Sequence, residues 1–342
     1  MKQPAATPPL VSIVMPAYNC ASYIREAVQS VIDQTEQNWE LIILDDRSTD
    51  DTAAIVSSIR DPRIILTGSE ENIGQANQLN KGIAMARGEF IAVAHGDDIN
   101  EPTRLKEQLA VFKQDASVGV VGTWIRYVGE RTGTWEYPVG SANCFLMMLE
   151  DSPLAHPTVM IRKSVLARLP FIYRQELVPA EDYDLWARLS AVTRFENVPR
   201  YLLRYRVHHF QVSKRKEAEL ANRIERVKSE FIRSNFGFLP PAETEILSSL
   251  IRLGPGAYLS RSLIKGASRL AHWLDGYNQI TERQWKNKIN QLLARGLMIT
   301  KKYEPGTGIY FLLLNPGMVF RIRPSHLARI ILRSVKTKTY IS

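Results

Sequence analysis

VSIVMPAYNCASYIREAVQSVIDQTEQNWELIILDDRSTDDTAAIVSSI, residues 11–59, alternates twice between a short apolar run and an amphipathic stretch. In residues 22–34 the apolar side chains recur at helical spacing, and the run before them reads as a strand. The same pair of patterns follows at residues 63–86 and again at residues 90–112. Because the strand runs are nearly all Val, Ile and Leu, we expect a parallel sheet flanked by helices. The sequence therefore predicts an α/β, Rossmann-like, doubly wound domain.

The alternation becomes irregular beyond this region. Residues 117–124, 156–166 and 200–208 contain strand patterns, and residues 180–190 form a helical pattern. From about Lys216 onward, helical patterns dominate. We therefore expect three parts, which are a flexible tail over residues 1–9, an α/β domain over residues 10–215 and a basic, mostly helical region over residues 216–342.

The composition limits the class of protein. At 45% hydrophobic and 23% charged residues, the 342-residue chain suits a globular protein and excludes a disordered or fibrous one. No stretch reaches the roughly 18–20 apolar residues of a membrane-spanning helix. The first ten residues hold one Lys and no signal-peptide-like apolar run, so we expect a cytoplasmic protein. The two cysteines, Cys20 and Cys144, are too few for a disulfide framework or a zinc site.

Basic residues are concentrated in the second part of the chain. Residues 201–342 hold 25 Lys and Arg against 9 Asp and Glu, whereas residues 1–200 hold 19 against 26. No aromatic interleaving or nucleic-acid module accompanies this charge, so we expect no nucleic-acid partner. Residues 216–233, 280–298 and 326–338 are amphipathic and basic. They are either packed helices with solvated basic faces or a peripheral contact with the anionic inner face of the cytoplasmic membrane. The oligomeric state is left open.

Polar side chains gather where the first four predicted strands end. These ends read Pro16-Ala17-Tyr18-Asn19, Asp45-Asp46-Arg47-Ser48, Glu71-Asn72-Ile73-Gly74 and His95-Gly96-Asp97-Asp98. Ligands bind at the carboxyl ends of parallel strands. Helix capping explains Ser48 and Asn100, but it does not explain Asp97 and Asp98, which directly follow an apolar strand. Because adjacent carboxylates repel unless a cation neutralises them, we expect a site for Mg²⁺ or Mn²⁺ and a diphosphate here.

A glycine-rich phosphate loop does not follow the first strand. MPAYNCAS, residues 15–22, fits neither the dinucleotide-binding fingerprint nor the Walker sequence, which argues against dehydrogenases and P-loop NTPases. A nucleotide whose phosphates are held through a metal fits better. Asp46 is then a candidate to accept a hydrogen bond from a pyrimidine N3–H. Tyr18 is a candidate to flank the base, with core packing as its alternative.

Six segments together resemble glycosyltransferase family 2, the inverting enzymes of the GT-A fold. They are VSIVMPAYN (11–19), LDDRSTDDT (44–52), ENIGQANQLNKGIAMARGEFIAVAHGDD (71–98), AHPTVMIRKSVL (155–166), AEDYDLWARL (180–189) and YRVH (205–208). The resemblance implies a GT-A catalytic domain over residues 10–215. It also implies metal-dependent transfer of a sugar from a UDP- or dTDP-linked donor to a hydroxyl of a saccharide or lipid-linked acceptor. Such transfer belongs to bacterial-type glycan or polysaccharide biosynthesis.

The same resemblance assigns the donor side of the site. The expected donor-nucleotide contacts are Pro16, Ala17, Tyr18, Asn19, Asp46, Asn72 and Asp97. Asp97 and Asp98 resemble the family's D-x-D-type pair, with Asp98 as the better metal ligand. His95 stands where many relatives carry the first acidic residue. This difference leaves open the metal identity, and also the alternative of a catalytically degenerate relative that binds a nucleotide or partner proteins in a glycan-assembly complex.

Inversion requires a base on the acceptor side, opposite the leaving diphosphate. Glu181 and Asp182 match the family's acidic pair, which implies that Asp182 is the base and that Glu181 raises its proton affinity or holds an acceptor hydroxyl. The alternative is an acidic first helical turn that favours the helix dipole. The resemblance further implies that His208 reaches the metal and that His156 lines the acceptor side. Trp186 is either a platform for the acceptor or a core residue.

Overall fold

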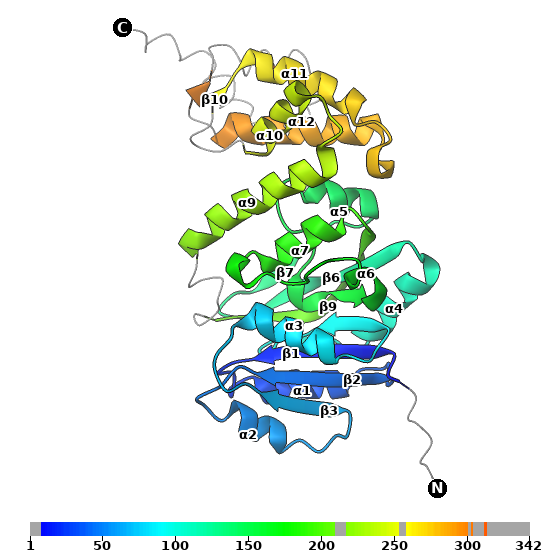
Figure 1. Ribbon diagram of the computed structural model, residues 1–342, viewed down its shortest axis with the longest axis vertical. Helices are drawn as coiled ribbons and strands as arrows, with labels where there is room; N and C mark the ends of the chain where they lie inside the picture. The colour runs from blue at the N-terminus through cyan, green and yellow to red at the C-terminus, as the bar shows by residue number, and fades with distance from the viewer. Residues whose placement is uncertain (1–7, 209–216, 253–257, 300–301, 304–310, 313–342) are drawn as a thin grey trace. The chain divides into compact units, whose positions relative to one another are not determined.

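A computed structural model describes residues 8–208, 217–252, 258–299, 302–303 and 311–312 of the chain (Figure 1). The chain divides into two compact units, Met1–Val227 and Lys228–Ser342. This boundary lies inside helix α9 (Glu217–Phe236) and therefore later in the chain than the division expected at residue 215. Every residue that the sequence nominates for catalysis or binding belongs to the first unit.

The first four strands of the large sheet run parallel to one another. They are β1 (Val11–Ala17), β2 (Trp39–Asp45), β3 (Ile64–Gly68) and β4 (Phe90–Val93). They alternate with helices α1 (Ile24–Ile32), α2 (Thr52–Ser57) and α3 (Gln75–Met85). β1 pairs with β2 and β4, and β2 pairs with β3. All of β2 and β4 is buried, so the expected α/β domain with strands covered on both faces is confirmed.

Beyond β4 the sheet contains both parallel and antiparallel pairs. Its order in the described residues is β3-β2-β1-β4-β8-β6-β9-β5, with β7 paired to β6. The added strands are β5 (Ile99–Asn100), β6 (Val118–Gly129), β7 (Gly133–Trp135), β8 (Met160–Arg162) and β9 (Arg194–Val207). The accompanying α-helices are α4 (Arg104–Gln114), α5 (Ser141–Met147), α6 (Lys163–Leu166) and α7 (Glu181–Leu189). β8 runs antiparallel to β4 and β6, while β6 and β9 are parallel. This mixed pairing accounts for the irregular sequence pattern after residue 117.

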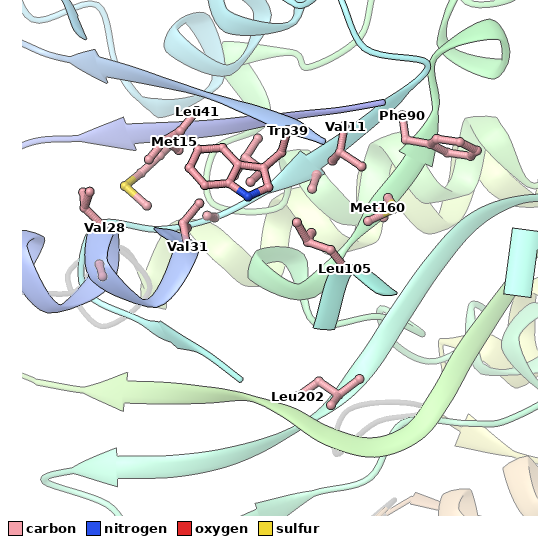
Figure 2. Close-up of a cluster of buried hydrophobic side chains, with 14 of the residues drawn as sticks. Val11, Met15, Val28, Val31, Trp39, Leu41, Phe90, Leu105, Met160 and Leu202 are labelled. Carbon is pink, nitrogen blue, oxygen red and sulfur yellow. The ribbon is translucent and has the colours of Figure 1, made fainter. Parts of the chain in front are cut away.

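A single hydrophobic cluster joins one face of the parallel strands to helices α1 and α4 (Figure 2). Met15 and Leu41 from the strands pack with Val28 of α1 and Leu105 of α4, and each is at most 2% exposed. Burial of a side chain of this size contributes about 1.5–3 kcal/mol. The cluster therefore holds the strand ends, and the loops that follow them, in fixed positions.

A fully buried arginine, Arg104, fastens α4 to the strand ends next to the site. Its Nη2 donates to the carbonyl oxygens of Val93, at 2.8 Å, and Val159, at 3.3 Å. Its remaining donors reach the side-chain oxygens of Asn100 and Gln108. Burial lowers the pKa of Arg104 to about 9. Asn100 therefore binds this guanidinium and does not cap α4, contrary to the sequence expectation.

The second unit is mostly helical in its described part, as expected. Its helices after α9 are α10 (Pro241–Ile251), α11 (Arg261–Trp273) and α12 (Glu282–Ile299), with short parallel strands β10 (Tyr258–Leu259) and β11 (Lys302–Tyr303). Phe236 and Trp285 are fully buried and meet edge to face. Among the described residues, no helix has the length and apolarity that crossing a bilayer requires. The basic segment 326–338 lies outside the described residues.

Candidate functional site

The loops after β1 and β2 are joined by reciprocal hydrogen bonds. The backbone N–H of Asn19 donates to Ser48 Oγ at 3.0 Å, and the N–H of Thr49 donates to Asn19 Oδ1 at 2.8 Å. Asn19 adopts a φ of 50°, a left-handed conformation that Asn tolerates better than most residues. Tyr18 is 49% exposed, so the structure excludes the core-packing alternative for this ring. Ser48 therefore holds the neighbouring loop and does not cap its own helix.

Asp46, at the end of β2, holds the loop that follows β3. Its Oδ1 accepts from the N–H of Ile73 and from Gln78 Nε2, and its Oδ2 accepts from the N–H of Gly74 at 2.9 Å. Asn72 Nδ2 donates to the Asp46 carbonyl oxygen. Asp46 is 4% exposed. The structure thus gives Asp46 a loop-organising role that the sequence did not predict, because its partners lie 26–32 residues away.

Three ligand-bearing side chains converge after β4. Single ligand atoms of His95, Asp97 and Asp98 lie within 4.8 Å of one another. Asp98 is 1% exposed, and its Oδ1 accepts the N–H of Arg206 at 2.8 Å. Its Oδ2 has no hydrogen-bond partner among the described residues and lies 3.8 Å from His95 Nδ1. Such a buried oxygen requires a cation or a proton.

The two aspartates differ in proton affinity. Burial, followed by the charge of Asp97, raises the pKa of Asp98 well above its usual range. Burial also acts to raise the pKa of Asp97, but a hydrogen bond from His208 and the nearby imidazoles outweigh it and leave that pKa lowered. His208 Nε2 lies 3.0 Å from Asp97 Oδ2. His208 therefore contacts Asp97 but is not among the three residues whose ligand atoms converge in the described part of the chain, and its role as a metal ligand stays a prediction.

A chain of polar contacts leads from this cluster into the core. His95 Nε2 lies 3.2 Å from His156 Nδ1, and His156 Nε2 lies 3.0 Å from the hydroxyl of Tyr173. Burial lowers the pKa of both histidines. The rings are also in tilted or edge contact. His156 thus has both ring nitrogens engaged by protein groups, and its place on the acceptor side stays a prediction.

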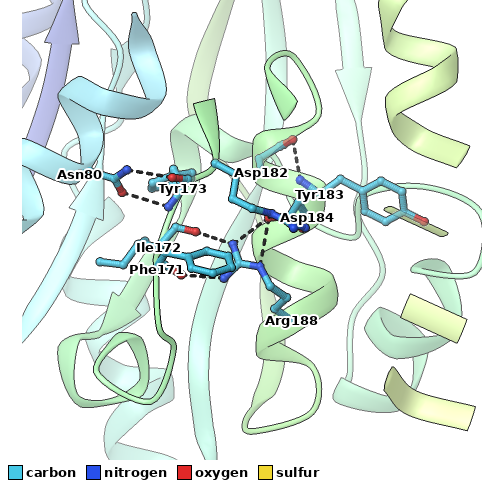
Figure 3. A network of polar contacts seen from close by, with 9 residues as sticks. Asn80, Phe171, Ile172, Tyr173, Asp182, Tyr183, Asp184 and Arg188 are labelled. Atoms are coloured by element: carbon cyan, nitrogen blue, oxygen red, sulfur yellow. Dashed lines mark hydrogen bonds and ion pairs between the residues drawn. The ribbon is translucent and has the colours of Figure 1, made fainter. Parts of the chain in front are cut away.

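Asp182 is the second residue of helix α7 and directly follows Glu181. Its Oδ1 accepts the N–H of Tyr183 at 2.7 Å (Figure 3). Burial, followed by the charge of Glu181, raises the pKa of Asp182 to about 8. A carboxylate with a pKa near the working pH can accept a proton efficiently. The structure therefore gives Asp182 the proton affinity that general-base catalysis requires.

The other acidic residue of this turn, Asp184, has a structural role. It is 1% exposed and accepts a hydrogen bond from Arg174. It also accepts hydrogen bonds from Arg188 (Figure 3). Arg188 also donates to the carbonyl oxygens of Phe171 and Ile172. These contacts fasten residues 171–174 to α7. Residues 171–174, which precede Asp182 in the sequence, are therefore held by a buried ionic network.

Trp186 belongs to the core. The side chain is fully buried, with its ring 6.3 Å from that of Phe195 and 6.4 Å from that of His156. The alternative that Trp186 is a platform for an acceptor is wrong, because no face of the ring is exposed.

Two partly buried tyrosines that the sequence did not single out, Tyr137 and Tyr205, lie within range of the charges of the acidic groups. Burial is the main cause that raises the pKa of each tyrosine. The charges of Asp98 and Asp182 raise the pKa of Tyr205, on β9, further, and the charge of Asp182 does the same for Tyr137. The rings of Tyr127 and Tyr205 meet edge to face at 5.9 Å. Tyr127 and Tyr205 are paired in the register of β6 and β9, and because side chains alternate along a strand, this pairing puts both rings on the same face of the sheet. The sequence alone does not give this register.

The family described as Glycosyl transferase family 2 matches residues 12–169. The chain is 32% identical over 231 residues to an Escherichia coli protein named UDP-Glc:alpha-D-GlcNAc-diphosphoundecaprenol beta-1,3-glucosyltransferase WfaP. That match covers 66% of this chain and 88% of the relative. The chain belongs to glycosyltransferase family 2. Its candidate site is accordingly that of a sugar-transferring enzyme.

Solved structures share the fold of this glycosyltransferase. Residues 1–349 of Staphylococcus aureus TarS in complex with UDP-GlcNAc give a TM-score of 0.60 at 18% identity, covering 95% of this chain and 89% of that one. The mannosyltransferase PcManGT from Pyrobaculum calidifontis, in complex with GDP-Man and Mn²⁺, gives 0.51 at 17% identity, covering 97% and 89%. The expected GT-A fold is thereby confirmed.

Proposed function

We propose that this glycosyltransferase moves a sugar, with inversion, from a UDP- or dTDP-linked donor to a hydroxyl of a lipid-linked saccharide. The observation that carries the proposal is the pairing of two different acidic sites in one unit. One is the His95, Asp97 and Asp98 cluster, whose ligand atoms converge. The other is Asp182, a carboxylate whose pKa is raised to about 8 by burial and by Glu181.

The donor side rests on the loops after β1, β2 and β3. Tyr18 is exposed at the end of β1, where a nucleobase can stack on its ring. Asp46 fixes the backbone of Ile73 and Gly74, so its role toward the base is to shape the pocket and to accept one further hydrogen bond. The neighbour TarS was solved with UDP-GlcNAc, which supports a uridine donor.

A divalent cation fits the cluster after β4. Asp98 would hold it through the buried Oδ2, which lacks a hydrogen-bond partner among the described residues, together with a carboxylate oxygen of Asp97. When bound, the cation neutralises charge that develops on the leaving diphosphate. Arg206 positions Asp98 through its backbone N–H, and its Nε donates to the Asp97 carbonyl oxygen at 2.9 Å.

The transfer is a single displacement. Asp182 takes the proton of the acceptor hydroxyl as the oxygen bonds to the anomeric carbon and the bond to the diphosphate oxygen breaks. The nearby negative charge of Glu181 increases the proton affinity of Asp182. The ionic network of Asp184 keeps the start of α7 in place during this step. The product is a glycoside of inverted anomeric configuration and a nucleoside diphosphate.

The proposed acceptor class rests on a relative of known name, and the proposed contact with a membrane rests on the positive charge of residues 201–342. The relative WfaP is named for an acceptor on diphosphoundecaprenol. Residues 201–342 of this chain carry 25 Lys and Arg against 9 Asp and Glu. Such a surface suits peripheral contact with an anionic membrane that holds a lipid-linked acceptor. Flotation with anionic and neutral vesicles tests this contact, and equal recovery with both vesicle types would contradict it.

The decisive experiment is a thermal-shift panel of UDP, dTDP, GDP and CDP, each with and without Mn²⁺. We expect one pyrimidine diphosphate to raise the midpoint in a metal-dependent manner, followed by turnover of the corresponding sugar nucleotides. Proton NMR of the anomeric centre then reports inversion or retention. Binding without turnover toward any lipid-linked saccharide would favour the degenerate relative instead.

A further inference from the structure

His95 is the residue at which this chain departs from the acidic pattern of its family, and its surroundings are unusual. Its Nδ1 faces Asp98 Oδ2 at 3.8 Å, too far for a hydrogen bond. Asp98 is 1% exposed, and this oxygen has no hydrogen-bond partner among the described residues. A nitrogen of the partly buried His95 and a buried carboxylate oxygen of Asp98 thus lie opposite each other without a hydrogen bond.

The opposite edge of the ring is held by the protein. His95 Nε2 contacts His156 Nδ1 at 3.2 Å, and His156 Nε2 contacts the Tyr173 hydroxyl at 3.0 Å. If His95 Nε2–H donates to His156 and His156 Nε2–H donates to Tyr173, each ring is neutral and each contact has one donor. This arrangement leaves a lone pair on His95 Nδ1, directed toward Asp98. Histidines that bind metals are oriented in the same way through their other nitrogen.

We propose that His95 binds the cation through Nδ1 and thereby makes the site select Mn²⁺ or Co²⁺ over Mg²⁺. Mg²⁺ prefers oxygen ligands and gives up its water reluctantly, whereas imidazole suits transition metals. A nitrogen ligand in place of a carboxylate therefore weakens Mg²⁺ binding more than it weakens Mn²⁺ binding. The inference rests on the cation-dependent function proposed above and identifies the residue that sets the choice of metal. Tyr173 and His156 act as positioning residues for His95.

Mn²⁺ binding to the full chain, with and without UDP, provides a test that does not depend on sugar transfer. Electron paramagnetic resonance measures free and bound Mn²⁺, and competition with Mg²⁺ gives the ratio of the two affinities. Pulsed measurements detect a directly bound ¹⁴N nucleus. We expect a ¹⁴N coupling in the wild type that is lost in His95→Ala and in His95→Asp.

The His95→Asp variant restores a carboxylate, and we expect it to shift the affinity ratio toward Mg²⁺ by about tenfold or more. Tyr173→Phe keeps all candidate ligands and is expected to weaken Mn²⁺ binding by about tenfold through loss of orientation. His272→Ala, a histidine on α11, is the matched control and should retain both the ¹⁴N coupling and the ratio. Circular dichroism checks that each variant is folded.

Several outcomes would overturn the inference. They are a ¹⁴N coupling that persists in His95→Ala, a coupling lost only in His208→Ala, an unchanged ratio in His95→Asp, and absence of Mn²⁺ binding under all conditions. Sugar transfer with an unchanged metal ratio would refute the inference and leave the proposed function standing. Mn²⁺ bound to ¹⁴N without sugar transfer would support the inference and contradict the proposed function.

Discussion

Replacement of Asp182 by Asn removes the proposed base while keeping the shape of the side chain. Burial and the charge of Glu181 raise the pKa of Asp182 to about 8, so the active, ionised form is a minority at neutral pH. The ionised fraction is about 1% at pH 6, about 10% at pH 7 and about 90% at pH 9. We therefore expect kcat/KM to rise about tenfold per pH unit below pH 7.5 and to level off above pH 8.5.

The assay measures nucleoside diphosphate released from the sugar nucleotide that the binding panel identifies, with a GlcNAc-diphosphate lipid as acceptor. For Asp182→Asn we expect a loss of about 10²–10⁴-fold in kcat, with unchanged nucleotide affinity and no acidic limb in the pH profile. Glu181→Gln is the matched control. It keeps the base but removes the second cause of its raised pKa, so its acidic limb should move to lower pH.

A stability measurement supports the same reasoning without an acceptor. Because the folded chain binds the Asp182 proton more tightly than the unfolded chain does, the contribution of Asp182 to the stability of the wild type should decline as the pH rises from about 4 to 8. Asp182→Asn should lack this decline, as measured by urea unfolding at several pH values. Retained turnover in Asp182→Asn would refute the assignment of Asp182 as the base. An acidic limb near pH 5 in the pH profile of wild-type kcat/KM would also refute it.

Three further changes test the framework of the site by urea unfolding. Asp184→Asn leaves Arg174 and Arg188 without their buried carboxylate and should cost about 3–5 kcal/mol, together with activity; a loss below 1 kcal/mol would contradict this. Gly82→Ala places a Cβ 2.4 Å from Val14 Cγ1 and 2.9 Å from Leu44 Cδ2, and should cost about 1–3 kcal/mol from overpacking. Glu40→Gln weakens buried hydrogen bonds and should cost about 2 kcal/mol at pH 7; because the pKa of Glu40 is lowered from 4.5, this difference should be fully present above that pH and be lost as the pH falls through the lowered pKa.

The parallel half of the fold was predictable because its signals are local. An apolar run such as residues 41–44 can be buried on both faces only in a covered sheet, and the structure buries these four residues completely. The antiparallel insertion of β8 between β4 and β6 was not predictable, since β8 has only three residues and its partners lie far away in sequence.

Part of the candidate site was also predictable from local sequence signals. Asp97 and Asp98 come four and five residues after the last residue of β4, Val93, so their place near its carboxyl end follows from their position in the sequence. The chain from His95 through His156 to Tyr173 was not visible, because it joins residues 61 and 17 positions apart. The sequence left Trp186 open between a platform for the acceptor and a core residue, because helical spacing does not distinguish a side chain that faces the core from one that lines a cleft.

The clasp that Asp46 makes with the loop after β3 affects how a nucleotide binds. Ile73 and Gly74 are already held by the Asp46 carboxylate before any ligand arrives. The conformational entropy of this loop is therefore lost during folding. Nucleotide binding then has only a small entropic cost for ordering the loop. Differences in affinity among nucleobases should then arise from contacts with the base itself. In the proposed donor site, nucleobase selectivity should therefore change with single substitutions at base-contacting residues, while the loop held by Asp46 keeps its conformation.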